Sequence, residues 1–237
     1  VPFRALVREA MKRSAGGLGM AIAAEEPWTG GDFVIARLTA DDGSRGVGEA
    51  FVWLPETGVS PAQIVDAVAH GLARYLLGAN PFDVGSLRAR MDANVARSEV
   101  AKGLLDMACY DLAGRIAGRS ACELMGGRGA DELPLAALIP LDDADSMTTM
   151  ALAFQRSGTR TFRLKLGTGL EADRRVVAQA REALGPEARL RVDYNQAYSA
   201  PEAVRALRLL EAYGIGAAEQ PLVVGDMLGM VDVQKQT

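Results

Sequence analysis

The feature that most limits the fold of this chain is a regular alternation of strand-like and helix-like segments from Leu133 onwards. The predicted strands begin at intervals of about 25–30 residues, and apolar residues at helical spacing follow each of them. This alternation is typical of parallel strands covered by helices. We expect strands at 133–138, 161–166, 189–195 and 215–219, and helices at 143–156, 171–184, 201–213 and in the final residues.

The preceding part of the chain has a different pattern, which predicts a separate α+β domain. Strand-like residues 33–40 and 46–50 flank a turn and indicate a β-hairpin. Helices are expected at 61–76, with Ser60 as the N-cap, and at 98–116. Glycines between positions 126 and 129 separate the two patterns. We therefore expect one domain over residues 1–130 and a second over residues 131–237.

Composition argues against several classes of protein. The net charge is −4 and no basic stripe is present, so nucleic acid is not an expected partner. No apolar stretch reaches the roughly 18 residues of a membrane span, and no signal peptide is visible. Cys109 and Cys122 lack metal-binding or redox spacing, so we expect two reduced thiols in a cytoplasmic protein.

Two architectures with parallel strands compete for the second domain. A doubly wound sheet normally has a glycine-rich nucleotide-binding turn after a strand. Gly167-Thr168-Gly169 follows a strand but lacks the third glycine of that signature. The alternative is a TIM-type β/α barrel, in which the active site gathers at the carboxyl ends of the strands. The charges at those ends favour the barrel.

Three consecutive predicted strands carry ionic or polar side chains on one face near their carboxyl ends. Alternation along a strand places apolar residues on the opposite face, toward the helices. Solvated faces of edge strands are the alternative interpretation. Buried charges are costly unless they are paired or bind a metal, so three such strands together predict a functional site. Its members are Arg163, Lys165, Asp193, Asn195 and Glu219.

The residue types in this cluster predict a specific chemistry. Asp193 and Glu219 supply hard oxygen ligands, which suit Mg²⁺ or alternatively Mn²⁺. No histidine or cysteine lies nearby in the sequence, which argues against zinc. Lys165, next to a second cation and a metal, is a candidate general base. A metal beside a base suits removal of a proton next to a carboxylate.

Several motifs of this chain, in this order, resemble the mandelate racemase and muconate lactonizing enzyme family of the enolase superfamily. The barrel motifs are Arg163-Leu-Lys165, Asp193-Tyr-Asn195 and Glu219-Gln-Pro221. Gly46-Val-Gly-Glu-Ala50, the helix through Asp106-Met-Ala-Cys-Tyr-Asp-Leu-Ala113 and Leu124-Met-Gly-Gly127 resemble the capping domain of the family. The resemblance implies a capping domain followed by a β/α barrel.

The resemblance also implies roles for individual residues. Lys165 matches the base of the family, and Asp193 and Glu219 match its first two metal ligands. Asn195 and Gln220 are expected beside these groups. Arg163 stands where the family usually has a lysine that contacts the substrate carboxylate, and its forked guanidinium also suits a carboxylate.

Two loops of the capping domain shape the substrate pocket in this family, and here they resemble residues 15–32 and 51–58. Trp28 and Trp53 lie in these loops. Both are candidates to line the pocket, although packing in a local core is an equally good interpretation. The resemblance further implies a homo-oligomer.

Length is the main departure from the family pattern. The residues from Leu133 to Thr237 suffice for about four of the eight units of a closed barrel. The third metal ligand and the opposing catalytic group of the family belong to the fifth and sixth strands. We expect the remaining half of the barrel, and a first capping strand, to be absent from this sequence; a true half-barrel is the alternative.

These inferences predict an Mg²⁺-dependent isomerase that removes the proton next to a carboxylate of a small substrate through an enediolate. Racemisation or epimerisation and cycloisomerisation follow from that step, and a muconate-lactonizing type is favoured because Lys165 stands without a visible His–Asp pair. An acid-sugar dehydratase (a lyase), a non-catalytic homologue and a barrel enzyme with a phosphate-bearing substrate are the alternatives.

Overall fold

The computed structural model describes residues 31–237. Its internal contacts divide these residues into two units, and the boundary along the chain falls between Asp131 and Glu132. Residues 1–30, which include Trp28 and most of the first predicted pocket loop, lie outside the described residues.

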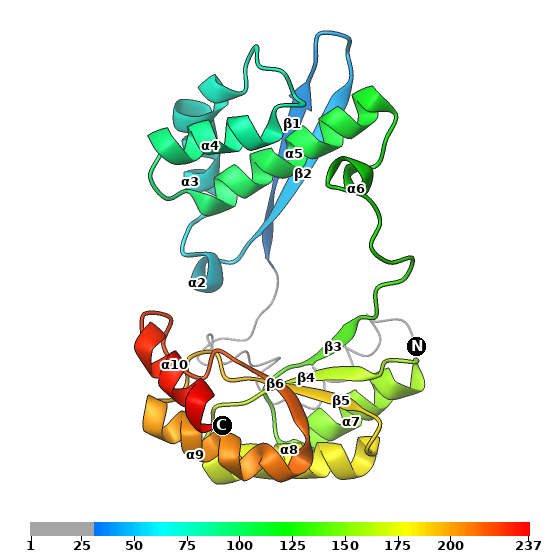
Figure 1. The fold of residues 1–237 in the computed structure, drawn as a ribbon, viewed down its shortest axis with the longest axis vertical. Coiled ribbons are helices and arrows are strands. Elements are labelled where there is room, and N and C mark those ends of the chain that lie inside the picture. Colours follow the sequence, from blue (N-terminus) through cyan, green and yellow to red (C-terminus); the bar gives the residue numbers. More distant parts are fainter. Residues whose placement is uncertain (1–30) are drawn as a thin grey trace. The chain divides into compact units, whose positions relative to one another are not determined.

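The second unit is built on a four-stranded parallel sheet in the order β3-β4-β5-β6. The strands are β3 (Ala136–Ile139), β4 (Thr161–Lys165), β5 (Arg189–Asp193) and β6 (Ile215–Glu219). Helices α7 (Ala144–Arg156), α8 (Leu170–Leu184) and α9 (Ala200–Leu210) cover one face of the sheet, and α10 (Met227–Gln236) follows β6 (Figure 1). The predicted alternation is confirmed. A doubly wound sheet carries helices on both faces, whereas these four strands follow chain order and have their helices on one face, as in a β/α barrel.

The two faces of this sheet differ in polarity as predicted. Phe162, Leu164, Leu190 and Val192 point from β4 and β5 into a core shared with the helices, and each is fully buried. The opposite face carries the ionic side chains. Parallel strands usually carry apolar side chains on both faces of the sheet. The ionic face of this sheet is therefore a candidate functional surface.

The loops of this unit are fixed by helix caps that the sequence encodes. Asp143 accepts a hydrogen bond from the Ser146 amide at the start of α7, and Asp226 caps α10 in the same way. Ser199 and Glu202 form a capping box at the start of α9. These caps satisfy orphan amides at the helix ends that lie nearest the carboxyl ends of the strands.

The first unit pairs a hairpin with one long helix. Strands β1 (Asp32–Thr39) and β2 (Arg45–Val52) are antiparallel, and α5 (Glu99–Ala117) packs against β2. The unit also contains α2 (Leu54–Thr57), α3 (Pro61–Asp66), a π-helical segment (Ala67–Leu72), a 3₁₀ segment (Ala73–Tyr75), α4 (Val84–Asn94) and α6 (Ala121–Leu124).

Two glycines of β2 allow α5 to approach the strand. A Cβ atom at Gly46 would lie 2.4 Å from the carbonyl oxygen of Ala108. A Cβ atom at Gly48 would lie 2.1 Å from the carbonyl oxygen of Leu104. Both neighbours are helix backbone, which has little freedom to move, so the glycine-x-glycine motif serves helix–strand packing.

Two expectations for this unit were wrong in detail, and one helix was missed. The predicted helix 61–76 is α-helical only to Asp66 and continues as π and 3₁₀ turns. Helix α4 was not predicted, although Val84, Leu87 and Met91 form its buried side. The predicted loop 51–58 is the end of β2 followed by the short helix α2. In the other unit, β3 begins at Ala136 because Leu133 and Leu135 remain exposed and unpaired.

Candidate functional site

The carboxyl ends of β4, β5 and β6 bring three predicted residues into one row. Lys165 is in register with Asp193, and Asp193 is in register with Glu219. These residues therefore lie on adjacent strands at the same height in the sheet. A register shift between Leu190 and Arg191 adjusts β5 against β6 below this level.

Lys165 and Asp193 form a buried ion pair. The Lys165 Nζ atom lies 2.7 Å from Asp193 Oδ2, and the two side chains are 4% and 2% exposed. Lys165 also donates a hydrogen bond to the side-chain oxygen of Asn195. The backbone amide of Asn195 in turn donates to Asp193 Oδ1. The predicted neighbours thus form a connected network, as buried charges require.

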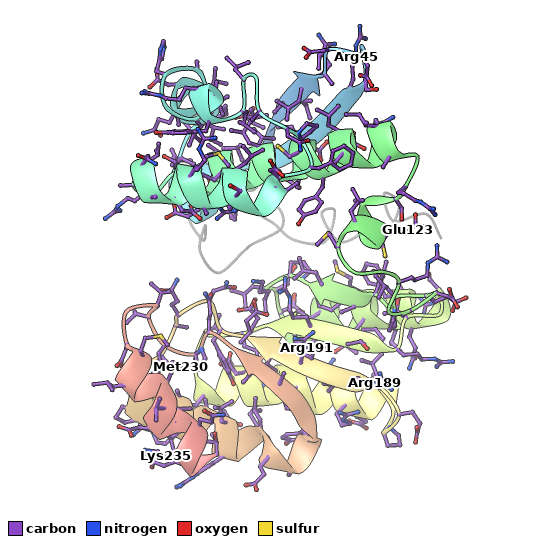
Figure 2. The ribbon with its side chains drawn as sticks, turned by 45° about the horizontal axis from the view of Figure 1, so that its top comes forward. Arg45, Glu123, Arg189, Arg191, Met230 and Lys235 are labelled. Carbon is purple, nitrogen blue, oxygen red and sulfur yellow. The ribbon has the colours of Figure 1, made fainter. Side chains whose placement is uncertain are left out.

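Arg163 contacts the outer carboxylate of the row. Its Nη1 atom lies 3.0 Å from Glu219 Oε2 and 3.8 Å from Asp193 Oδ2. The guanidinium donates to Glu219, and its contact with a substrate carboxylate stays a prediction. Arg191, which is labelled in Figure 2, is the register partner of Arg163 and so lies on the same face of the sheet. Three cations therefore accompany two carboxylates on this face, which favours an anionic ligand.

The backbone beyond β5 and β6 adopts sparsely populated conformations. Asn195, Gln196 and Gln220 have φ values of 46°, 70° and 42°. The Gln196 amide donates to the Gln220 carbonyl oxygen at 2.7 Å, and Gln196 Oε1 accepts from the Val224 amide. Strained residues held by specific bonds are concentrated at functional sites. Gln220 is thus placed at the site through its backbone, and its side chain is exposed.

Sequence reasoning missed three residues that build the loops around the row: Asp173, Gln196 and Tyr198. Asp173 is buried and accepts hydrogen bonds from the Gly167 and Thr168 amides and from the Tyr198 hydroxyl. Burial, and then the bond to Asp173, raise the pKa of Tyr198. An acidic residue in the first turn of a helix resembles an ordinary dipole partner, so the sequence held no distinct signal for Asp173.

The carboxylates of the row fit part of the coordination shell of a hard divalent cation. Asp193 and Glu219 offer oxygen donors from adjacent strands, and Mg²⁺ is commonly held by one or two carboxylates with further oxygen ligands. Within residues 31–237, no group of three or more His, Cys, Asp or Glu side chains is arranged to hold a metal. Asp193 and Glu219 are thus two candidate ligands among the described residues.

Trp53 lies in the first unit, where it is half-buried and precedes α2. Its carbonyl oxygen accepts hydrogen bonds from the Thr57 amide and hydroxyl. A pocket role for Trp53 remains a prediction.

In the described residues, no helix is long and apolar enough to cross a membrane.

Comparison with known families identifies both units. Residues 20–126 match the N-terminal domain of the mandelate racemase/muconate lactonizing enzyme family. Residues 146–237 match the enolase C-terminal domain-like family. The chain belongs to the mandelate racemase/muconate lactonizing enzyme family. The resemblance that the motifs suggested is therefore confirmed.

Relatives with assigned activities are isomerases of several kinds. N-succinyl-L-Arg/Lys racemase of Bacillus cereus is 28% identical over 86% of this chain and 56% of its own length. Chloromuconate cycloisomerase of Cupriavidus pinatubonensis is 32% identical over 86% of this chain and 56% of its own length. The family therefore includes racemases as well as cycloisomerases, and the comparisons do not single out the muconate-lactonizing branch.

A solved structure of a relative supports the same fold. Dipeptide epimerase from Enterococcus faecalis, complexed with Mg and the dipeptide L-Leu-L-Tyr, superimposes with a TM-score of 0.86 at 30% identity. The alignment covers 94% of this chain and 62% of that one. The present chain thus spans little more than half the length of the relatives it matches.

Proposed function

We propose that the protein is an Mg²⁺-dependent isomerase that removes the proton next to a carboxylate of a small substrate. The observation that carries this proposal is the row of Lys165, Asp193 and Glu219 at equal height on three parallel strands. A base and two oxygen ligands are thereby directed toward the same space. Racemases, epimerases and cycloisomerases among the relatives support this class of reaction.

Each residue of the row has a distinct role in this proposal. Lys165 Nζ takes the proton after it has released its own to solvent and become neutral, and its burial keeps water from competing for that position. Arg163, which is 34% exposed at its side chain, orients the substrate carboxylate. Asp193 and Glu219 hold Mg²⁺, with Asn195 fixing Lys165 and Gln220 fixing the loop beyond Glu219. Mg²⁺ supplies positive charge opposite the negative charge that develops on the substrate.

The organisation of the whole protein is part of the proposal. We assign residues 1–130 to a capping domain that shapes the substrate pocket, with Trp28 and Trp53 in its loops. Residues 131–237 form the first β/α units of the catalytic barrel. A homo-oligomer is included in the proposal, and light scattering of the purified protein tests it.

Incorporation of solvent deuterium tests the reaction. The whole protein is incubated with Mg²⁺ in D₂O, together with N-succinyl amino acids, dipeptides or muconates. We expect one substrate class to gain deuterium at the carbon next to its carboxylate, and chelation with EDTA to stop this gain. Loss of optical activity indicates a racemase, an epimeric product an epimerase, and a lactone a cycloisomerase. Mg²⁺ binding without deuterium gain in any class favours a non-catalytic homologue.

A further inference from the structure

Tyr198, in the loop between β5 and α9, contacts the loops that follow all three strands of the row. Its hydroxyl accepts a hydrogen bond from the Gly169 amide, at 3.2 Å, in the loop after β4. Its own amide donates to the Pro221 carbonyl oxygen, at 2.9 Å, in the loop after β6. The tyrosine thus links the segments that follow Lys165, Asp193 and Glu219.

Asp173 completes this junction from the first turn of α8. Its carboxylate accepts the Tyr198 hydroxyl at 2.5 Å and the amides of Gly167 and Thr168 at 3.0 and 3.2 Å. Three consecutive amides after β4 are therefore held by Asp173 and Tyr198 together. Asp173 is 2% exposed, so each donor that it loses leaves part of a buried charge unsatisfied.

The packing around these bonds is tight. A Cβ atom at Gly167 would lie 2.5 Å from the Cβ atom of Ala197, so the loops after β4 and β5 are in close contact. The ring of Tyr198 packs on the ring of Tyr194, with centroids 5.3 Å apart. Displacement of one loop therefore moves the next one.

We propose that Tyr198 and Asp173 are positioning residues that keep Lys165, Asp193 and Glu219 aligned. Neither residue belongs to the row itself, and both act through the backbone of the three loops. The inference rests on the proposed function where it concerns catalysis. Its structural part, the coupling of the three loops, stands without that function.

Tyr198→Phe removes the hydroxyl but retains the ring, and Tyr213→Phe is the matched control. The Tyr213 hydroxyl accepts a hydrogen bond from Arg174 at 3.3 Å, and Tyr213 lies two residues before the first residue of β6, at the opposite end of that strand from Glu219. Amide hydrogen exchange of the metal-free protein is measured for both variants. In Tyr198→Phe, we expect the amides of Gln196 and Val224 to exchange about tenfold faster, because opening spreads through the junction. Faster exchange confined to residues 167–169 overturns the coupling.

Steady-state kinetics test the catalytic part. Tyr198→Phe should lower kcat by roughly 10- to 100-fold, the change equivalent to one hydrogen bond to a charged group, and leave KM within about threefold. Tyr213→Phe should leave kcat unchanged within about twofold. Equal kcat in both variants overturns the positioning role. A wild-type protein without activity refutes the proposed function instead, and the exchange experiment then decides on the coupling.

Where Tyr198→Phe fails to fold, Asp173→Asn replaces it. This variant keeps the size of the side chain and removes the charge that the Tyr198 hydroxyl and two amides share. The same acceleration at Gln196 and Val224 is expected. Its absence contradicts the proposal.

Discussion

Within residues 31–237 each unit buries one lysine, and the comparison shows what distinguishes a site from a structural pair. Lys102 in α5 is 4% exposed and Lys165 in β4 is 3% exposed. Lys102 binds Asp92 at 2.9 Å and the Val95 carbonyl oxygen at 2.6 Å. Lys165 binds Asp193 at 2.7 Å. Burial and a carboxylate partner are therefore common to both lysines.

The neighbours of the two lysines differ. Asp92 lies near the end of α4 and its side chain is 48% exposed, so the pair of Lys102 joins two helices at the rim of their contact. Asp193 is 2% exposed, and a second cation and a second carboxylate stand beside it. A functional site is thus marked by several unlike charges on adjacent strands, and a single satisfied pair is sufficient for structure.

Replacement of each lysine should give the largest difference between the two units, in activity for Lys165 and in stability for Lys102. Lys165→Ala should lower incorporation of solvent deuterium into substrate by at least about 100-fold, because general bases contribute roughly 10²–10⁴-fold. Lys102→Met should leave that rate unchanged within about twofold and lower the free energy of unfolding by about 1–3 kcal/mol. Mass spectrometry of substrate and thermal unfolding measure the two effects. Undiminished exchange in Lys165→Ala removes Lys165 as the base.

The glycines at the β2–α5 contact provide the next test. In Gly48→Ala, the new Cβ atom would meet the Leu104 carbonyl oxygen at 2.1 Å, so we expect a loss of about 1–3 kcal/mol of stability. Gly103→Ala is the control, since a Cβ atom there meets nothing within 4 Å beyond its chain neighbours and the adjacent backbone of its own helix, and alanine favours the helix by about 0.5–1 kcal/mol. Equal denaturant midpoints for the two variants would contradict the close packing.

The smallest expected effect is the loss, in acid, of the stability that the Lys102–Asp92 pair contributes. The hydrogen bond from Lys102 lowers the pKa of Asp92 below its ordinary value of 3.8. A carboxyl group with a lowered pKa stabilises the fold above its ordinary pKa, and this contribution is lost as the pH falls through the lowered pKa. The melting temperature of Asp92→Asn should therefore fall less steeply than that of the wild type below about pH 4. Parallel curves would show that the pair contributes nothing.

Much of the second unit could be predicted because its apolar periodicity is regular. The alternation of Phe162 and Leu164 with Arg163 and Lys165 determines which face of β4 meets the helices. The motifs likewise predicted that Lys165 and the two carboxylates would lie together. Their common height was not predictable, because it depends on the pairing of distant strands.

Other features depend on tertiary contacts that the local sequence does not express. The π turns at Ala67–Leu72 follow an ordinary helix start at Ser60, and nothing in those residues distinguishes them from α-helix. The contact of Arg163 with Glu219 and the junction at Tyr198 join residues that are far apart in the chain. Helix α4 was missed for another reason, since its three buried residues form only a narrow apolar stripe.

We infer that the strand ends form one metal-binding catalytic centre, and titration of the protein with Mg²⁺ by calorimetry decides whether they do. Asp193→Asn and Asp92→Asn each remove a carboxylate that pairs with a buried lysine. We predict that the whole wild-type protein and Asp92→Asn bind Mg²⁺ with equal affinity, and that Asp193→Asn loses at least about tenfold. Equal affinity in all three proteins, or no binding in the wild type, would show that Asp193 does not hold Mg²⁺.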